Sequence, residues 1–128
     1  MDKSHSVILV VEDEVLIRMD VADQLAELGY EVKEAASGAE AQTILREGQQ
    51  IDVVFTDVDM PGELDGITLA REIVADGRAR AVIVTSGKHL VGSTALPDGV
   101  PFIPKPYYLP AVHAKIQLLL ARNDDSST

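Results

Sequence analysis

Short apolar runs alternate along the chain with longer segments that carry apolar residues every three or four positions. The pattern predicts strands over 7–11, 31–35, 53–56, 81–85 and 100–103. It predicts helices over 14–28, 37–48 and 64–77, and a last helix from 109 onwards. Such alternation is typical of βα units, which build a parallel sheet. We therefore expect a doubly wound α/β domain with five parallel strands and helices on both faces of the sheet.

Each predicted helix has an apolar face that should pack on the sheet. These faces comprise Val15, Met19, Ala22, Leu25 and Ala26 in the first helix, Ile67, Ala70, Ile73 and Val74 in the third, and Val112, Ile116, Leu119 and Leu120 in the last. Ser37 followed by Glu40 indicates a capping box at the start of the second helix. Glycines at positions 29, 48 and 77 mark the predicted ends of the first three helices.

One segment, between the fourth and fifth predicted strands, departs from the alternation. Residues 87–99 include Gly92-Ser93-Thr94 and Pro97-Asp98-Gly99, which favour turns. We expect the fourth helix to be short or irregular there. The domain is expected to span residues 6–122, and a polar tail at 123–128 is expected to fray.

Composition narrows the classes of function. The chain has 128 residues, which suits one domain, and its formal net charge of −10 lacks the basic footprint that nucleic-acid binding requires. It has no cysteine, and its apolar runs are far shorter than the roughly 20 residues of a membrane span. His5, His89 and His113 show no metal-ligand spacing and are expected at the surface. We expect a cytoplasmic protein that binds neither nucleic acid nor a membrane.

Polar side chains of the kinds that act in catalysis or bind metal ions follow four of the predicted strands. They are Glu12 and Asp13 after the first strand, Asp57 after the third, Ser86 after the fourth and Lys105 after the fifth. In an open parallel sheet the carboxyl ends of the strands lie side by side and form the ligand crevice. These side chains should therefore converge on one small site. The second strand carries no such residue and is expected at the sheet edge, in the order 2-1-3-4-5.

This set of side chains suits phosphoryl transfer to a carboxylate. Asp57 can attack phosphorus and form an acyl phosphate if neighbouring charges hold the transferring group in line. Glu12 and Asp13 are candidate ligands of Mg²⁺, which prefers oxygen and offsets the repulsion among crowded carboxylates. Ser86 would donate a hydrogen bond to one phosphoryl oxygen, and Lys105 would place its ammonium group against another.

Each residue taken alone also has a simpler explanation. Asp57 could only form a turn, and Glu12 and Asp13 could only be acids at the start of a helix. Ser86 could cap a helix, and Lys105 could be a solvated surface residue. The order of acid pair, aspartate, hydroxyl and lysine, each at the end of an apolar run, is much more specific than any one of them.

Four stretches together form the pattern of a known family. They are Ile8-Leu9-Val10-Val11-Glu12-Asp13-Glu14, Asp57-x-x-Met60-Pro61 followed by Asp65-Gly66, Val82-Ile83 ahead of Ser86-Gly87, and Lys105-Pro106. In them the chain resembles the receiver domain of two-component response regulators, from about Ser6 to Arg122. The resemblance implies a flavodoxin-like fold. It also implies a phosphorelay function, with a sensor histidine kinase or a phosphotransfer protein as the phosphoryl donor.

The resemblance assigns a role to each acidic residue. Asp57 is the phosphoacceptor, and Asp13 and Asp57 are ligands of Mg²⁺, with Mn²⁺ as an alternative ion. Glu12 acts on the ion through water. The backbone carbonyl of Asp59 completes the ligand set.

Three further positions follow from the same resemblance. Ser86 takes the place of the family's switch serine or threonine, although Thr85 also carries a hydroxyl. Lys105 is the active-site lysine, and the bond between it and Pro106 is a candidate for the cis form. Phe102 takes the aromatic switch position but lacks the usual tyrosine hydroxyl.

Asp59 and Lys88 occupy the two positions that tune hydrolysis of the acyl phosphate in this family. We expect an ion pair between them that restricts the attacking water. The simplest interpretation of the sequence is a stand-alone receiver, either a monomer or a homodimer that forms on phosphorylation, which switches its binding to a downstream protein or passes the phosphoryl group on. A receiver cut from a longer protein would show the same sequence pattern.

Two rival hypotheses belong to other classes of protein. The pair Asp57 and Asp59 resembles the nucleophile and acid of haloacid-dehalogenase-like phosphatases. That class needs a further acidic pair after a late strand, and Asp124-Asp125 instead lies in the polar tail. The second rival is a receiver-like interaction module that is never phosphorylated, against which the complete set of site residues argues.

Overall fold

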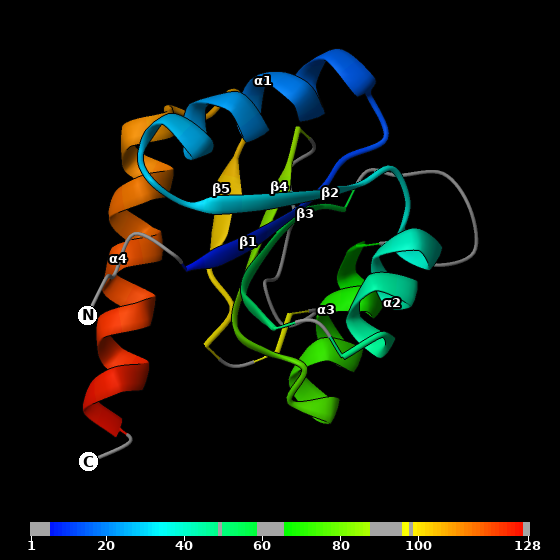
Figure 1. The fold of residues 1–128 in the computed structure, drawn as a ribbon, viewed down its shortest axis with the longest axis vertical. Coiled ribbons are helices and arrows are strands. Elements are labelled where there is room, and N and C mark those ends of the chain that lie inside the picture. The colour runs from blue at the N-terminus through cyan, green and yellow to red at the C-terminus, as the bar shows by residue number, and fades with distance from the viewer. Residues whose placement is uncertain (1–5, 49, 59–65, 88–95, 98, 127–128) are drawn as a thin grey trace.

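The computed structural model describes residues 6–48, 50–58, 66–87, 96–97 and 99–126. Within these ranges the elements are β1 (Val7–Val11), α1 (Val15–Glu27), β2 (Glu31–Ala35), α2 (Gly38–Arg46), β3 (Ile51–Asp57), α3 (Gly66–Asp76), β4 (Ala79–Ser86), β5 (Phe102–Pro104) and α4 (Leu109–Ser126). The strands form one parallel sheet in the order β2-β1-β3-β4-β5 (Figure 1). The predicted α/β fold and strand order are confirmed.

Side chains alternate between the two faces of the sheet and bury an apolar cluster on each face. Along β3, Val54 packs with residues of α2 and α3, whereas Val53 and Phe55 pack with residues of α1 and α4. Figure 1 shows the same division, with α1 and α4 on one side of the sheet and α2 and α3 on the other. Because β1 and β3 are buried on both faces, their apolar runs are nearly continuous.

The start of α2 and the end of α3 lie at the capping residues that the sequence predicted. The Ser37 Oγ atom accepts a hydrogen bond from the Glu40 amide at 3.1 Å, and Glu40 Oε1 accepts one from the Ala36 amide at 2.9 Å. These two bonds form a variant of the predicted capping box, in which Glu40 binds the amide of the residue before the N-cap Ser37. α3 ends before Gly77, whose φ of 65° lies in the left-handed region that glycine adopts without strain.

α1 packs on the sheet with only part of the predicted face, because Ala22 and Leu25 are buried as predicted but Val15 and Met19 are not. The residues it buries are Val21, Ala22 and Leu25. Val15 and Met19, predicted to point inwards, are 51% and 50% exposed, and Val74 of α3 is 47% exposed. Apolar residues surround more of α1 than a single stripe, so their spacing alone does not select the face that packs.

The last two elements differ in length from the prediction. α4 spans Leu109–Ser126 and so extends into the segment 123–128, which was predicted to fray as a tail. After Pro110 the sequence contains neither glycine nor proline, so no strong helix breaker ends α4 earlier. β5 begins later than predicted, because the Val100 amide instead donates to the Pro97 carbonyl at 3.3 Å in a turn.

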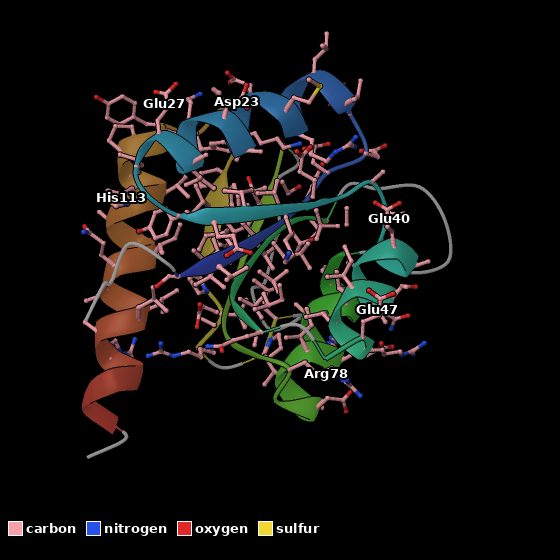
Figure 2. All side chains as sticks on the ribbon, viewed as in Figure 1. Asp23, Glu27, Glu40, Glu47, Arg78 and His113 are labelled. Atoms are coloured by element: carbon pink, nitrogen blue, oxygen red, sulfur yellow. The ribbon has the colours of Figure 1, made fainter. Side chains whose placement is uncertain are left out.

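His113 was predicted to lie at the surface, but it is half-buried. Its Nδ1 atom lies 2.9 Å from the hydroxyl of Tyr30. The two rings pack edge to face, with their centroids 5.5 Å apart. Burial raises the pKa of Tyr30 above its ordinary value. Figure 2 labels His113 on α4, and the contact ties this helix to the turn that follows α1.

Asp52 is a buried carboxylate that the sequence pattern did not single out. It lies at the amino-terminal end of the sheet, opposite the predicted site. Its Oδ2 atom accepts a hydrogen bond of 2.7 Å from the Val7 amide, and its Oδ1 atom lies 3.7 Å from Arg80 Nη1. Arg80 Nη2 also donates to the Leu120 carbonyl at 3.2 Å. These contacts join the starts of β1, β3 and β4 to α4.

No helix among the described residues is long and apolar enough to cross a membrane. The predicted irregular segment 87–99 lies largely outside the described residues, which resume with 96–97 and 99. Leu96 and Val100, on either side of the gap at 98, pack against the cluster shared with α2 and α3.

Candidate functional site

Three carboxylates meet at the carboxyl edge of the sheet. Glu12 and Asp13 follow β1, and Asp57 ends the neighbouring strand β3. One oxygen from each lies within 4.8 Å of the other two. Glu12 and Asp57 are only 3% exposed, whereas Asp13 is exposed to solvent. The structure thus brings together the three side chains that the sequence predicted to form an acidic site.

Lys105 supplies the positive charge of this site. Its Nζ atom donates to Asp57 Oδ2 at 2.9 Å and to Glu12 Oε1 at 3.4 Å. Burial alone would lower the pKa of Lys105, but the hydrogen bond and charge of Asp57, together with Glu12, raise it above the ordinary value. The side chain therefore remains a cation at neutral pH and holds the two buried carboxylates in place.

The environment of Glu12 opposes its ionisation. Burial raises the pKa of Glu12 to about 7, and the charge of Asp57 acts in the same direction. A hydrogen bond of 3.1 Å from the Glu14 amide to Glu12 Oε2 and the charge of Lys105 act the other way without cancelling the rise. A bound cation would act against this rise and favour the ionised form of Glu12.

The raised pKa of Glu12 predicts how the stability of the metal-free protein depends on pH. The folded protein binds this proton more tightly than the unfolded chain, whose glutamate has the ordinary value of 4.5. The stabilisation is therefore fully present below about pH 4.5 and is lost as the pH rises through 7. Relative to Glu12→Gln, which cannot ionise, the wild type should lose about 2 kcal/mol of unfolding free energy between pH 5 and pH 8.

Urea unfolding of both proteins in a chelating buffer measures this difference. Buffer effects common to the two proteins cancel, because the variants differ only in the ionisable group. A difference in unfolding free energy that stays constant from pH 5 to pH 8 would contradict the raised pKa.

Ser86 and Thr85 end β4 with their side chains on opposite faces of the sheet. Thr85 pairs with Asp57 in the register, and its hydroxyl is buried with no hydrogen-bond partner in the described part of the chain. Ser86 is also buried, and its carbonyl accepts a hydrogen bond of 2.9 Å from the Lys105 amide. By alternation along β4, Ser86 shares its face with Val84, which pairs with Phe102 of β5.

Thr85→Val separates these two hydroxyls experimentally. Valine has nearly the same shape and removes a polar group whose burial no hydrogen bond offsets, so the unfolding free energy should rise by about 1 kcal/mol. Phosphorylation by acetyl phosphate should keep the wild-type rate. Ser86→Ala, the matched variant, should slow that reaction about tenfold or more. The reverse ranking of the two rates would assign the functional hydroxyl to Thr85.

Of the remaining predicted site positions, the structure describes Phe102 and the bond between Lys105 and Pro106 but not Asp59 and Lys88. Phe102 is half-buried and packs against the apolar cluster shared with α2 and α3. The peptide bond between Lys105 and Pro106 is cis, as predicted. Asp59 and Lys88 lie outside the described residues, so the Asp59 carbonyl ligand and the Asp59–Lys88 ion pair stay predictions.

Two features of the site escaped the sequence analysis. Arg18, one turn into α1, donates from Nη1 to the Glu12 carbonyl at 2.8 Å. Tyr107 packs edge to face on Phe55, with the ring centroids 5.3 Å apart. Burial and, to a smaller extent, the charge of Glu12 raise the pKa of Tyr107 to about 12. The position of Arg18 shortly after the acid pair was a possible signal. The contact of Tyr107 depends on packing between distant segments, and spacing alone does not show it.

A groove opens beside Lys105, between α1 and the start of α4. Its volume is about 700 Å³, and its walls include Leu16, Ile17, Lys105, Tyr107, Tyr108 and Leu109. Leu16 is 78% and Tyr108 72% exposed. Lys105 belongs to both the groove and the acidic site, so the two adjoin each other.

The sheet order and the acidic edge with its lysine define a class of protein. It is a doubly wound α/β domain whose strand ends form a site for a cation and an anion. The chain belongs to the response regulator receiver domain family, whose model matches residues 8–117. It is thus a receiver domain of phosphorelay signalling, a class that pairs with histidine kinases or phosphotransfer proteins.

Sequence similarity to named proteins supports membership of this family. The chain is 37% identical over 124 residues to the sensor kinase CckA of Brucella abortus (strain 2308), covering 91% of this chain and 13% of CckA. It is 39% identical over 118 residues to the transcriptional regulatory protein PdtaR of Mycobacterium tuberculosis (strain CDC 1551 / Oshkosh), covering 90% of this chain and 57% of PdtaR. The chain therefore spans well under two thirds of either relative.

A solved structure shows a similar domain with ligands bound. The response regulator TrrA of Thermotoga maritima, in complex with Mg²⁺ and BeF, matches with a TM-score of 0.75 and 28% identity. The match covers 89% of this chain and 98% of the TrrA chain.

Proposed function

We propose that Asp57 accepts a phosphoryl group from a phosphohistidine. The observation that carries this proposal is the buried Asp57 carboxylate, hydrogen-bonded to Lys105 at 2.9 Å and clustered with Glu12 and Asp13. In the reaction a carboxylate oxygen of Asp57 forms a bond to phosphorus while the phosphorus–nitrogen bond of the donor breaks. The imidazole leaves with that electron pair, and Asp57 carries an acyl phosphate.

The donor set at the acidic edge fits Mg²⁺. It consists of carboxylate oxygens, and one lysine does not balance three of them. Asp13 and Asp57 would bind the ion, Glu12 would bind through water, and the Asp59 carbonyl would complete the set. Mn²⁺ accepts the same kind of oxygen ligands. When bound, the ion supplies positive charge to the carboxylates and to the transferring group, as the TrrA complex with Mg²⁺ and BeF supports.

Lys105 orients the nucleophile and then stabilises the product. Before transfer, its hydrogen bond to Oδ2 holds the Asp57 carboxylate in one orientation. Its raised pKa keeps the ammonium group charged at neutral pH. After transfer, the same group is close enough to bind a phosphoryl oxygen as a point charge.

Ser86 and Phe102 are proposed to carry the conformational response. The new phosphoryl group adds nearly two negative charges and three hydrogen-bond acceptors beside the end of β4. The Ser86 hydroxyl would turn towards it. Phe102 lies on the same face of the sheet, beside Val84, and could then occupy the space this movement frees. Phosphorylation would bias an equilibrium between two arrangements of this face.

The groove beside Lys105 is suited to the phosphohistidine donor. It exposes the apolar side chains of Leu16 and Tyr108 and shares Lys105 with the acidic site, so a partner bound there could present a phosphohistidine to Asp57. Asp20 and Gln24 add polar groups along the α1 wall. We propose that a helical segment of a sensor kinase or phosphotransfer protein packs its apolar face in this groove.

The main rival, a haloacid-dehalogenase-like phosphatase, makes a different kinetic prediction. A receiver takes one phosphoryl group per chain from acetyl phosphate and does not steadily turn over a phosphomonoester. Repeated release of phosphate from p-nitrophenyl phosphate, abolished in Asp57→Asn, would favour the phosphatase and contradict the proposal. A single covalent phosphoryl group on the wild type, missing in Asp57→Asn, is the expected result.

A further inference from the structure

Arg18 joins three parts of the chain behind the acidic site. From α1, its Nη1 atom donates to the Glu12 carbonyl at 2.8 Å, and its Nε atom donates to Glu34 Oε1 of β2 at 3.2 Å. The Arg18 side chain is only 16% exposed, whereas Glu34 is 41% exposed, so the contact with the Glu12 carbonyl is the better shielded of the two. Figure 1 shows why they are possible, because α1 runs close to β2 at the edge of the sheet.

The contact to the Glu12 carbonyl controls the turn that carries the candidate ligands. This carbonyl belongs to the peptide group between Glu12 and Asp13, so its orientation sets the direction in which Asp13 leaves the strand. The Glu12 amide is held separately by the Ala35 carbonyl at 3.0 Å. Arg18 holds the carbonyl side of the same turn, next to the exposed Asp13.

We infer that Arg18 is a positioning residue for the cation site. It orients the Glu12–Asp13 peptide so that the Asp13 carboxylate points at Asp57, while Glu34 holds the guanidinium in place. This inference rests on the proposed function, since it concerns the same Mg²⁺ site. It extends that function by adding a residue that touches neither the ion nor the phosphoryl group.

Charge and positioning predict opposite effects of replacing Arg18. A positive charge near a cation site repels the ion, so removal of the charge alone would tighten Mg²⁺ binding. Loss of the hydrogen bond instead frees the turn and weakens binding. Residues that orient metal ligands typically contribute roughly 10- to 100-fold to metal affinity. Arg18→Met, which keeps a flexible unbranched stem but has neither the charge nor a hydrogen-bond donor, should therefore raise the dissociation constant for Mg²⁺ about tenfold.

The test is a titration of the full chain with Mg²⁺ alone, followed by NMR through the amide signals of Asp13 and Val58. Arg46→Met is the matched control, because it removes the same charge from an exposed position on α2 and should leave the affinity unchanged. Arg18→Lys keeps the charge and can reach only one of the two acceptors. It should restore part of the affinity, which a merely structural role of Arg18 would not produce.

The outcomes are distinguishable. Weaker Mg²⁺ binding by Arg18→Met, partly rescued by Arg18→Lys, supports the inference. Binding as tight as the wild type, or tighter, overturns it while leaving the proposed function intact. If Arg18→Met fails to fold, Arg18→Lys decides, because unchanged affinity overturns the inference and an intermediate affinity supports it. A wild type that binds no Mg²⁺ would overturn the proposed function, and the inference with it.

Discussion

Replacing Lys105 with methionine should slow phosphorylation of this protein by acetyl phosphate about 100-fold or more. Methionine fills similar space but carries no charge, so the developing charge on the phosphoryl oxygens loses its ammonium partner. Removing one such preorganised group from an active site costs roughly 100- to 1,000-fold in rate. The Asp57 carboxylate also loses the 2.9 Å hydrogen bond that orients it. Intact mass at timed intervals in saturating Mg²⁺ measures the rate.

Lys115→Met is the control for this experiment. Lys115 lies on α4, outside the acidic cluster, and its loss should leave the rate within twofold of the wild type. Urea unfolding of both variants would show whether each is folded at the assay temperature. A folded Lys105→Met protein that is phosphorylated at the wild-type rate would show that the ammonium group does not act on the transferring phosphoryl group.

Leu16→Glu should separate the two kinds of phosphoryl donor. Leu16 is 78% exposed on the wall of the groove, so a charge there should leave the fold and the acidic site unchanged. Phosphorylation by acetyl phosphate, which needs no groove, should keep its rate. Transfer from a phosphorylated kinase domain should fall about tenfold or more, because a buried charge at the centre of an apolar interface typically costs more than roughly 1.4 kcal/mol.

A panel of autophosphorylated histidine kinase domains would provide the donors, with the transferred label measured on gels. Leu118→Glu is matched to Leu16→Glu, because Leu118 is also an exposed leucine, at 52%, but lies on α4 away from the groove. It should leave both reactions unchanged. Equal losses from the two substitutions, or a loss with acetyl phosphate as well, would contradict the assignment of the groove to the donor.

The site could be predicted from the sequence because a parallel sheet aligns its carboxyl ends. Glu12, Asp57 and Lys105 are distant in the chain, but each directly follows an apolar run, and the strand order brings them within hydrogen-bond distance. Strand recognition was therefore sufficient to predict that these side chains converge. The structure adds the distances and shows that the lysine contacts both buried carboxylates.

What the sequence did not predict depends on how elements pack against each other. The apolar residues of α1 surround much of the helix, so their spacing did not show that Val15 and Met19 stay exposed. The groove exists only because Leu16 lies beside the segment before α4, a contact between distant parts of the chain. Arg18 lies shortly after the acid pair in the sequence, but its contacts depend on packing as well, since its acceptors are a backbone carbonyl and Glu34 of another strand.

The most direct test of the central claim is intact mass after incubation with Mg²⁺ and acetyl phosphate, for the wild type and Asp57→Asn. One added phosphoryl group on the wild type, and none on Asp57→Asn or after prior chelation of the metal, is the predicted result. Beryllofluoride with Mg²⁺, followed by NMR, reveals a site whose acyl phosphate hydrolyses too fast for detection by mass. A wild type that gains no phosphoryl group and shows no response to beryllofluoride would contradict phosphorylation at Asp57.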